Sequence, residues 1–166
     1  MPPAPRIPAA RILRDPGHLL AFGLGLGLAP VAPGTFGTLL GIPIALGLAR
    51  LGVPGAAIGT ALLFLAGIFL CGRTARELGA DDHPGIVWDE VVGYAIAVLF
   101  VPPGWPWWLA AFLLFRALDI VKPWPIREID HSLRGGLGTM LDDAVAGLFT
   151  GLALLLARLI FLDGSG

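Results

Sequence analysis

Long apolar blocks alternate with short charged segments along the chain. Four blocks stand out, at residues 36–53, 54–72, 91–115 and 144–162. A helix needs about 20 apolar residues to cross a bilayer, so each block has the length of a helix that crosses or enters a membrane. The first two blocks meet at a turn, residues 52–55, that contains two glycines and a proline. They predict a helical hairpin.

The third block is interrupted by Pro102, Pro103, Gly104, Trp105 and Pro106. Two prolines followed by a glycine do not continue a helix, and tryptophan is enriched where a membrane meets water. We therefore predict that this block folds back on itself instead of crossing once. The resulting fold class is all-α, a small polytopic membrane bundle with about four to five membrane helices and a broken or hairpin third block.

Composition supports one membrane domain. Of 166 residues 56% are hydrophobic and 14% are charged, and the mean hydropathy is +0.82. We predict a basic, proline-rich extension at 1–21, a single domain at 22–162 and a short tail at 163–166. The net charge of −1 and the scattered basic residues argue against a nucleic-acid partner. The single cysteine, Cys71, has no partner for a disulfide or a thiolate metal site.

The predicted hairpins place the N-terminus and both long polar loops on one face of the membrane. By the positive-inside rule this face is cytoplasmic, because it carries most of the basic residues. All acidic residues except Asp163 share it. Nine of the eleven basic residues lie there: Arg6, Arg11, Arg14, Arg73, Arg76, Arg116, Lys122, Arg127 and Arg134.

Two pairs of adjacent acids lie where apolar helices are predicted to begin, Asp89 with Glu90 and Asp142 with Asp143. Helix capping and the helix dipole, worth about 0.3 to 2 kcal/mol, explain one acid per helix. Two acids at each of two helices exceed that need. Carboxylate oxygens without cysteine or paired histidine are the ligands of a hard cation, so the pairs predict a magnesium site ahead of capping alone.

Polar residues between the two pairs predict an anion pocket. Arg116, Asp119 and Lys122 follow one another at the end of the third block, and cations beside an acidic metal site suit a bound phosphate. Arg127 and Arg134 fit lipid headgroups equally well. The glycines at 135–138 permit close backbone approach to a phosphate or form a flexible turn.

Three further residues are candidates on weaker patterns. Thr35 and Thr38 belong to a glycine-threonine segment, 32–38, that either supplies donors to a headgroup or packs against other helices. His83 lies six residues before Asp89 and is a loop histidine, with metal ligation or proton transfer as its alternatives.

Four segments carry a resemblance to a known family. They read GLAPVAPGTFGT at 27–38, WDEVVG at 88–93, FRALDIVKPWPI at 115–126 and GGLGTMLDDAVAG at 135–147. In this order they resemble bacterial phosphatidylglycerophosphatase A over about residues 22–160. The resemblance implies a magnesium-dependent phosphatase that converts phosphatidylglycerophosphate to phosphatidylglycerol at the cytoplasmic side of the inner membrane. The family's acidic positions correspond to Asp89, Glu90, Asp119, Asp142 and Asp143, with Asp130 as a further candidate.

A mechanism for such a substrate follows from these residues. Asp89, Glu90, Asp142 and Asp143 would hold one or two magnesium ions, and Arg116 and Lys122 would bind phosphate oxygens. A metal-bound water is favoured as the nucleophile over direct attack by an aspartate.

Two other functions compete with this interpretation. An ion- or proton-coupled transport protein could use the same carboxylates, but it predicts acids at mid-depth in the membrane. A CDP-alcohol phosphotransferase also uses magnesium and aspartates, but its Asp-Gly-x2-Ala-Arg signature is absent here.

Overall fold

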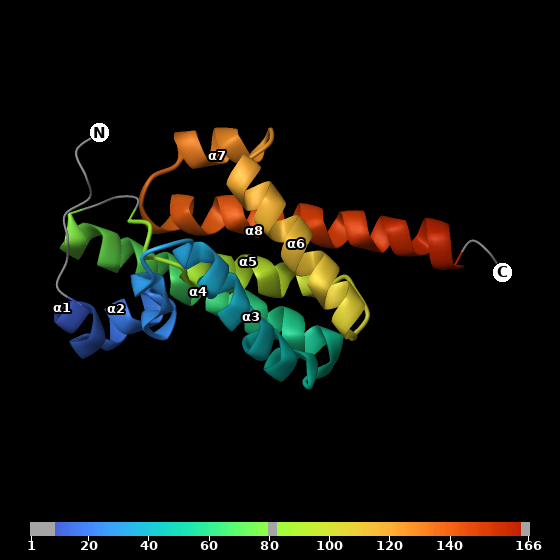
Figure 1. The fold of residues 1–166 in the computed structure, drawn as a ribbon, viewed down its shortest axis with the longest axis horizontal. Helices are drawn as coiled ribbons and strands as arrows, with labels where there is room; N and C mark the ends of the chain where they lie inside the picture. Colours follow the sequence, from blue (N-terminus) through green and yellow to red (C-terminus); the bar gives the residue numbers. More distant parts are fainter. Residues whose placement is uncertain (1–8, 80–82, 164–166) are drawn as a thin grey trace.

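The structure is a computed structural model that describes residues 9–79 and 83–163, and within these ranges it is helical and contains no strand (Figure 1). The predicted all-α class is thereby confirmed. Residues 1–8 of the predicted extension and 164–166 of the predicted tail lie outside the described residues. The helices are α1 (Ala9–Arg14), α2 (Pro16–Ala21), the 3₁₀ segment η1 (Gly23–Leu28), α3 (Pro33–Ala49), α4 (Gly52–Leu78), α5 (Trp88–Val98), α6 (Trp105–Val121), α7 (Ile126–Ser132), α8 (Gly135–Arg158) and the π-helical η2 (Leu159–Asp163).

Two helices are long and apolar enough to cross a membrane, Gly52–Leu78 and Gly135–Phe161. In the most apolar 18-residue stretch of each helix only 17% and 22% of the residues, respectively, are buried, whereas a core helix of a soluble protein is mostly buried. Large side chains such as Leu62, Leu65 and Phe69 are exposed along α4, which suits contact with lipid. At 11 residues α5 is about 17 Å long, too short to span a bilayer. The count of four to five membrane helices stays a prediction.

The first hairpin turns earlier than the sequence predicts. Helix α3 ends at Ala49 and α4 begins at Gly52, so residues 52–55 belong to α4 and not to the turn. Pro54 fits there because the first turn of a helix leaves its N–H groups without helical partners. Helices α5 and α6 form the second hairpin around the Pro-Gly segment, and the Tyr94 hydroxyl donates a 3.1 Å hydrogen bond to the carbonyl of Trp108 across it.

Helix α8 begins nine residues before the predicted position, at Gly135 instead of residue 144. The prediction that Asp142 and Asp143 lie at a helix N-terminus is therefore wrong, since they are the eighth and ninth residues of α8. The early start reflects close packing on α4. A Cβ on Gly136 would lie 1.9 Å from the carbonyl oxygen of Ile68, so this contact needs glycine despite its weak helix propensity.

The crossing of α5 and α8 positions the acidic residues. A Cβ on Gly147 would lie 2.1 Å from the carbonyl oxygen of Gly93, so the two backbones meet almost directly at this point. The crossing lies three residues beyond Glu90 in α5 and four residues beyond Asp143 in α8. It brings together two acidic segments that are 53 residues apart in the sequence.

Helices α1 and α2 pack against the end of α4 that follows its apolar part. Ile12 and His18 are buried, and Asp15 forms an ion pair of 2.8 Å with Arg73. His18 contacts two residues of α4, with its Nδ1 3.0 Å from the hydroxyl of Thr74 and its Nε2 3.2 Å from a carboxylate oxygen of Glu77. The described part of the N-terminal extension, residues 9–21, is thus attached to the bundle.

Candidate active site

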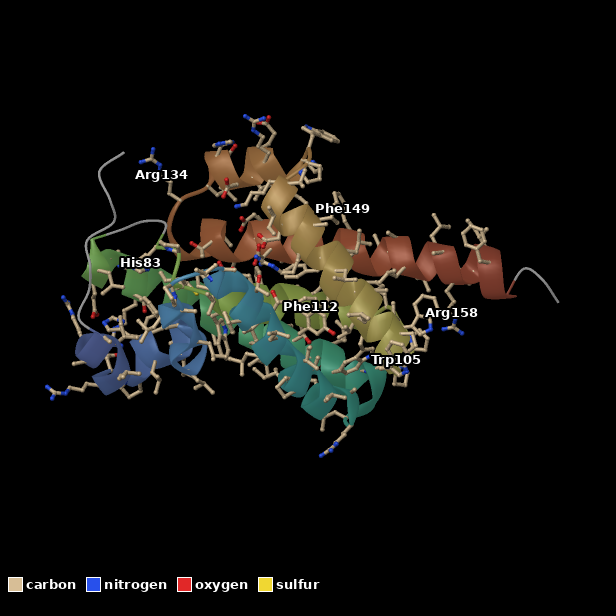
Figure 2. All side chains as sticks on the ribbon, in the orientation of Figure 1. His83, Trp105, Phe112, Arg134, Phe149 and Arg158 are labelled. Atoms are coloured by element: carbon tan, nitrogen blue, oxygen red, sulfur yellow. The ribbon has the colours of Figure 1, made fainter. Side chains whose placement is uncertain are left out.

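A cavity of about 770 Å³ lies between the first turns of α3 and α5, the end of α6, helix α7 and the first half of α8. Among the described residues its lining carries six carboxylates and three arginine or lysine side chains. Figure 2 shows His83 and Arg134, two lining residues, toward the end of the molecule where α1 and α2 lie. The charged lining residues are Asp89, Glu90, Arg116, Asp119, Lys122, Asp130, Arg134, Asp142 and Asp143.

Three of these carboxylates form a tight cluster. Asp89, Glu90 and Asp143 each offer an oxygen atom, and these three atoms lie within 4.8 Å of one another. Oε2 of Glu90 and Oδ2 of Asp143 are buried and accept no hydrogen bond. Buried polar atoms nearly always have a partner, so acceptor oxygens left unpaired here fit a hard cation such as magnesium.

Burial raises the pKa of Asp89 well above its usual range, and the adjacent charge of Glu90 raises it further. Burial is also the main cause that raises the pKa of Glu90. Carboxylates this close cannot all ionise without compensation. A bound divalent cation would supply it and restore the ionised forms.

Arg116 connects α6 to this cluster. Its guanidinium pairs with Asp119, three residues later, and lies 3.8 Å from Oε1 of Glu90. The side chain is only 14% exposed, and its Nε is buried without an acceptor. Asp119 offsets the charge of Arg116, and the guanidinium keeps N–H donors beyond the one that faces Asp119 and Glu90, as suits the binding of an anion.

Lys122 lies between two carboxylates of the lining. Its Nζ donates hydrogen bonds of 2.6 Å to Asp130 in α7 and 2.7 Å to Asp142 in α8. Burial opposes its charge, but these two hydrogen bonds hold the pKa of Lys122 above its usual value. The second oxygen of Asp142, Oδ1, is buried and unpaired. Asp142 is thus oriented by Lys122 and stands apart from the cluster of three carboxylates.

The beginning of α3 closes one side of the cavity through Gly34. A Cβ at this position would lie 2.1 Å from Oε1 of Glu90 and 3.0 Å from a guanidinium nitrogen of Arg116. Thr35 and Thr38 do not line the cavity, and the buried Thr38 hydroxyl donates to the carbonyl of Gly34. The glycine-threonine segment 32–38 thus forms this wall of the cavity with its backbone at Gly34, and the hydroxyls of Thr35 and Thr38 lie outside the cavity.

The structure therefore brings together nine of the eleven predicted site residues and leaves out the two threonines. His83 lines the cavity, and its Nδ1 accepts a 3.0 Å hydrogen bond from the N–H of Gly85. Sequence reasoning missed Gly34 and His131 as lining residues. The Pro-Gly pair at a helix start was a signal for Gly34, whereas nothing in the sequence distinguished His131.

Comparisons with known proteins place the chain, over most of its length, among its relatives. The sequence model of the family Phosphatidylglycerophosphatase A matches residues 19–158. Phosphatidylglycerophosphatase A of Haemophilus influenzae is 48% identical over 139 residues, covering 82% of this chain and 85% of that protein. The Escherichia coli protein of the same name is 42% identical over 139 residues, covering 83% and 81%. A putative phosphatidylinositol-3-phosphatase of Bacteroides thetaiotaomicron is 39% identical over 149 residues, covering 84% and 92%.

The family model and the named relatives define the class of protein as a phosphatase, whose described residues form a helical fold around an acidic, arginine-containing cavity. The chain belongs to the phosphatidylglycerophosphatase A family. The predicted resemblance and the predicted enzyme class, a phosphoric monoester hydrolase, are both confirmed. The search of solved structures found no significant match.

Proposed function

We propose that this chain hydrolyses the terminal phosphate of phosphatidylglycerophosphate to give phosphatidylglycerol and phosphate. The observation that carries the proposal is the cluster of Asp89, Glu90 and Asp143 beside Arg116 in one cavity. The names of the Haemophilus influenzae and Escherichia coli relatives support the choice of lipid.

Magnesium is the cofactor that we propose for this site, held by Asp89, Glu90 and Asp143. Six carboxylates against three permanent cations leave the described lining negative, so a phosphate dianion would be repelled unless a cation were present. The bound ion would neutralise the charge on the phosphate oxygens and polarise the phosphorus centre. The unpaired oxygens of Glu90 and Asp143 are the groups that would hold it.

Two residues outside this cluster complete the proposed chemistry. Arg116, with its unpaired Nε, binds an oxygen of the phosphate and stabilises the charge that develops there. Asp142, held by Lys122 through Oδ2, uses its free Oδ1 to take a proton from the water that attacks phosphorus. As the new P–O bond forms, the bond to the glycerol oxygen breaks, and that oxygen leaves with a proton from solvent.

We further propose that the protein is a multi-pass inner-membrane enzyme whose cavity faces the cytoplasm. Residues 144–161 follow Asp143 and contain a single charge, Arg158. In helical form these 18 residues span about 27 Å, close to the thickness of a hydrocarbon core. If they fill the core, Asp143 lies at one interface, at the depth of a lipid headgroup. The acyl chains of the substrate can then stay in the bilayer during the reaction.

The test is phosphate release from phosphatidylglycerophosphate in mixed micelles, with magnesium or with a chelator. We expect magnesium-dependent release, and a loss of at least about 100-fold in Asp143→Asn. Glu128→Gln is the matched control, because Glu128 is an exposed acid of α7 outside the cavity lining. Full activity of Asp143→Asn, or equal activity with chelator, would overturn the proposal.

A second arm of this assay addresses the headgroup and the transport alternative. Phosphatidylinositol 3-phosphate is included as a substrate because the Bacteroides thetaiotaomicron relative is named for the hydrolysis of that lipid. We expect slower release from it than from phosphatidylglycerophosphate. No comparison supports transport; proteoliposomes that move protons or ions without releasing phosphate would favour it over hydrolysis.

A further inference from the structure

A second cavity, of about 210 Å³, lies at the opposite end of the bundle from the carboxylates. The end of α3, the start of α4, the end of α5 and the loop and first turn of α6 surround it. Figure 1 shows the α3–α4 turn and the loop before α6 at the same end of the molecule, away from α1 and α2. The two cavities share no lining residue among those described.

The lining of this second cavity is almost wholly apolar, with side chains such as Leu48, Val53 and Val98. Two polar side chains interrupt it, Thr60 and Trp108, which are 4% and 9% exposed. The hydroxyl of Thr60 and the indole Nε1 of Trp108 are both buried and have no hydrogen-bond partner. Both belong to the same cavity, so they point to a polar atom that binds there.

Comparable groups elsewhere in the protein are satisfied. The buried hydroxyls of Thr38 and Thr150 donate to carbonyls four residues earlier, at 2.9 and 2.8 Å. The indole Nε1 of Trp88 donates a 3.2 Å hydrogen bond to the carbonyl of Leu63. Thr60 and Trp108 therefore depart from the pattern that this fold follows at its other buried threonines and at Trp88.

The ligand must carry a hydrogen-bond acceptor joined to an apolar chain. An indole N–H only donates, and a threonine hydroxyl can donate as well, so one or two carbonyl-type oxygens satisfy both. The cavity lies along the first nine residues of α4, Gly52 to Thr60, where a candidate membrane span begins. At that depth the hydrocarbon core gives way to the interfacial layer of the bilayer. The ester groups of phospholipids meet each of these requirements.

We propose that this cavity binds an ester-linked phospholipid of the surrounding bilayer. Its ester carbonyl accepts hydrogen bonds from Trp108 Nε1 and the Thr60 hydroxyl, and its acyl chain lies along Leu48, Val53 and Val98. This lipid is a bound structural ligand at the end remote from the carboxylate cavity, so the inference does not depend on the proposed hydrolysis.

The experiment compares the thermal unfolding of the purified full chain in detergent with either of two phosphatidylcholines added. One has ester-linked chains, and the other has ether-linked chains of equal length that lack the carbonyl. We expect the ester lipid to raise Tm by at least about 3 °C more than the ether lipid. Trp108→Phe and Thr60→Val should each lose most of this difference. Trp105→Phe, at an exposed tryptophan outside the lining, should keep it.

A spectroscopic signal separates this binding from a general effect of lipid. The indole ¹⁵N–H resonance of Trp108, identified by its absence in Trp108→Phe, should shift with the ester lipid and stay in place with the ether lipid. Equal shifts and equal Tm changes for both lipids would overturn the proposal. A second result would also overturn it: both variants have a higher Tm than wild type without lipid, and the ester lipid gives no extra shift in any of the three proteins. That result is expected if the cavity is empty and its unpaired polar groups only cost stability.

Discussion

The ammonium nitrogen of Lys122 lies 2.7 Å from Oδ2 of Asp142, a carboxylate on the eighth residue of α8. The same nitrogen lies 2.6 Å from Asp130 in α7. Lys122 also ends α6, with a left-handed backbone conformation at φ 45°. One residue thus terminates one helix and joins it to two others, and it sets the orientation of Asp142 in the cavity.

Replacing this lysine should cost stability because Asp142 is only 7% exposed and would keep an uncompensated charge. We expect Lys122→Met to lower the free energy of unfolding by about 1 to 3 kcal/mol. Adding Asp142→Asn to Lys122→Met should recover part of that loss, since the buried charge is then removed. Urea unfolding in detergent measures the four proteins of this double-mutant cycle. Strictly additive losses would contradict the pairing.

Arg116 should act in substrate binding through its planar guanidinium. A lysine at this position keeps the positive charge. It lacks the planar guanidinium, which pairs with Asp119 and has further N–H donors for an anion. We expect Arg116→Lys to lower kcat/KM for phosphate release by about 10- to 100-fold, with KM raised. Steady-state kinetics in mixed micelles measure both constants. Arg127→Lys, at an exposed residue of α7 outside the lining, should stay within about twofold of wild type.

Gly34 should tolerate no side chain. The Cβ of alanine would lie 2.1 Å from Oε1 of Glu90, so the carboxylate must move and the cavity wall must shift. We expect Gly34→Ala to lose at least about 10-fold in kcat while keeping its helical circular dichroism. Gly47→Ala is the control in the same helix, because nothing lies within 4 Å of a Cβ there. It should leave activity unchanged and stabilise α3 slightly. Equal activity of the two variants would contradict the close approach.

Asp15 should contribute stability that depends on pH. The hydrogen bond from the N–H of His18, and next the one from Arg73, lower the pKa of Asp15. A carboxylate whose pKa is lower in the folded state stabilises the fold above its unfolded pKa of about 3.9, and the contribution is lost as pH falls through the folded pKa. Asp15→Ala should therefore have a lower Tm than wild type at pH 7.

The difference in Tm between Asp15→Ala and wild type should shrink as the pH falls below about 4, because the wild-type carboxylate then becomes protonated. Thermal unfolding of both proteins from pH 7 to pH 3 measures it. A difference that stays constant over this range would show that the ionised form of Asp15 is not what stabilises α2 on α4.

Much of the fold was accessible from the sequence because its signals are local. The Pro-Pro-Gly segment at 102–104 lies between α5 and α6, as expected for residues that cannot continue a helix, and Pro106 falls in the first turn of α6. The start of α8 was not accessible in this way. Its glycines lower helix propensity, and tertiary packing, such as that of Gly136 on α4, stabilises the helix there. The local pattern therefore placed Asp142 and Asp143 at a helix end.

The candidate site, too, was predictable from the sequence only in part. The excess of acids beside apolar helices, and the nearby Arg116, predicted a metal and phosphate site from residue types alone, and the structure brings these residues to one cavity. The roles within the set depend on distances between helices. Asp89, Glu90 and Asp143 form one cluster, whereas Asp142 pairs with Lys122, and no property of the sequence separates two adjacent aspartates in this way.

By itself the sequence determined a helical membrane-type chain, the break between α5 and α6, and its phosphatase family, because hydrophobic spacing, proline and glycine act locally and motifs can be read in order. The tertiary structure decided which oxygens are left unpaired, which cation each acid contacts, and that a second cavity holds Thr60 and Trp108. These properties arise where separate helices cross. The Gly93–Gly147 contact that joins α5 to α8 depends on 53 residues of intervening chain folding back, and no local pattern specifies it.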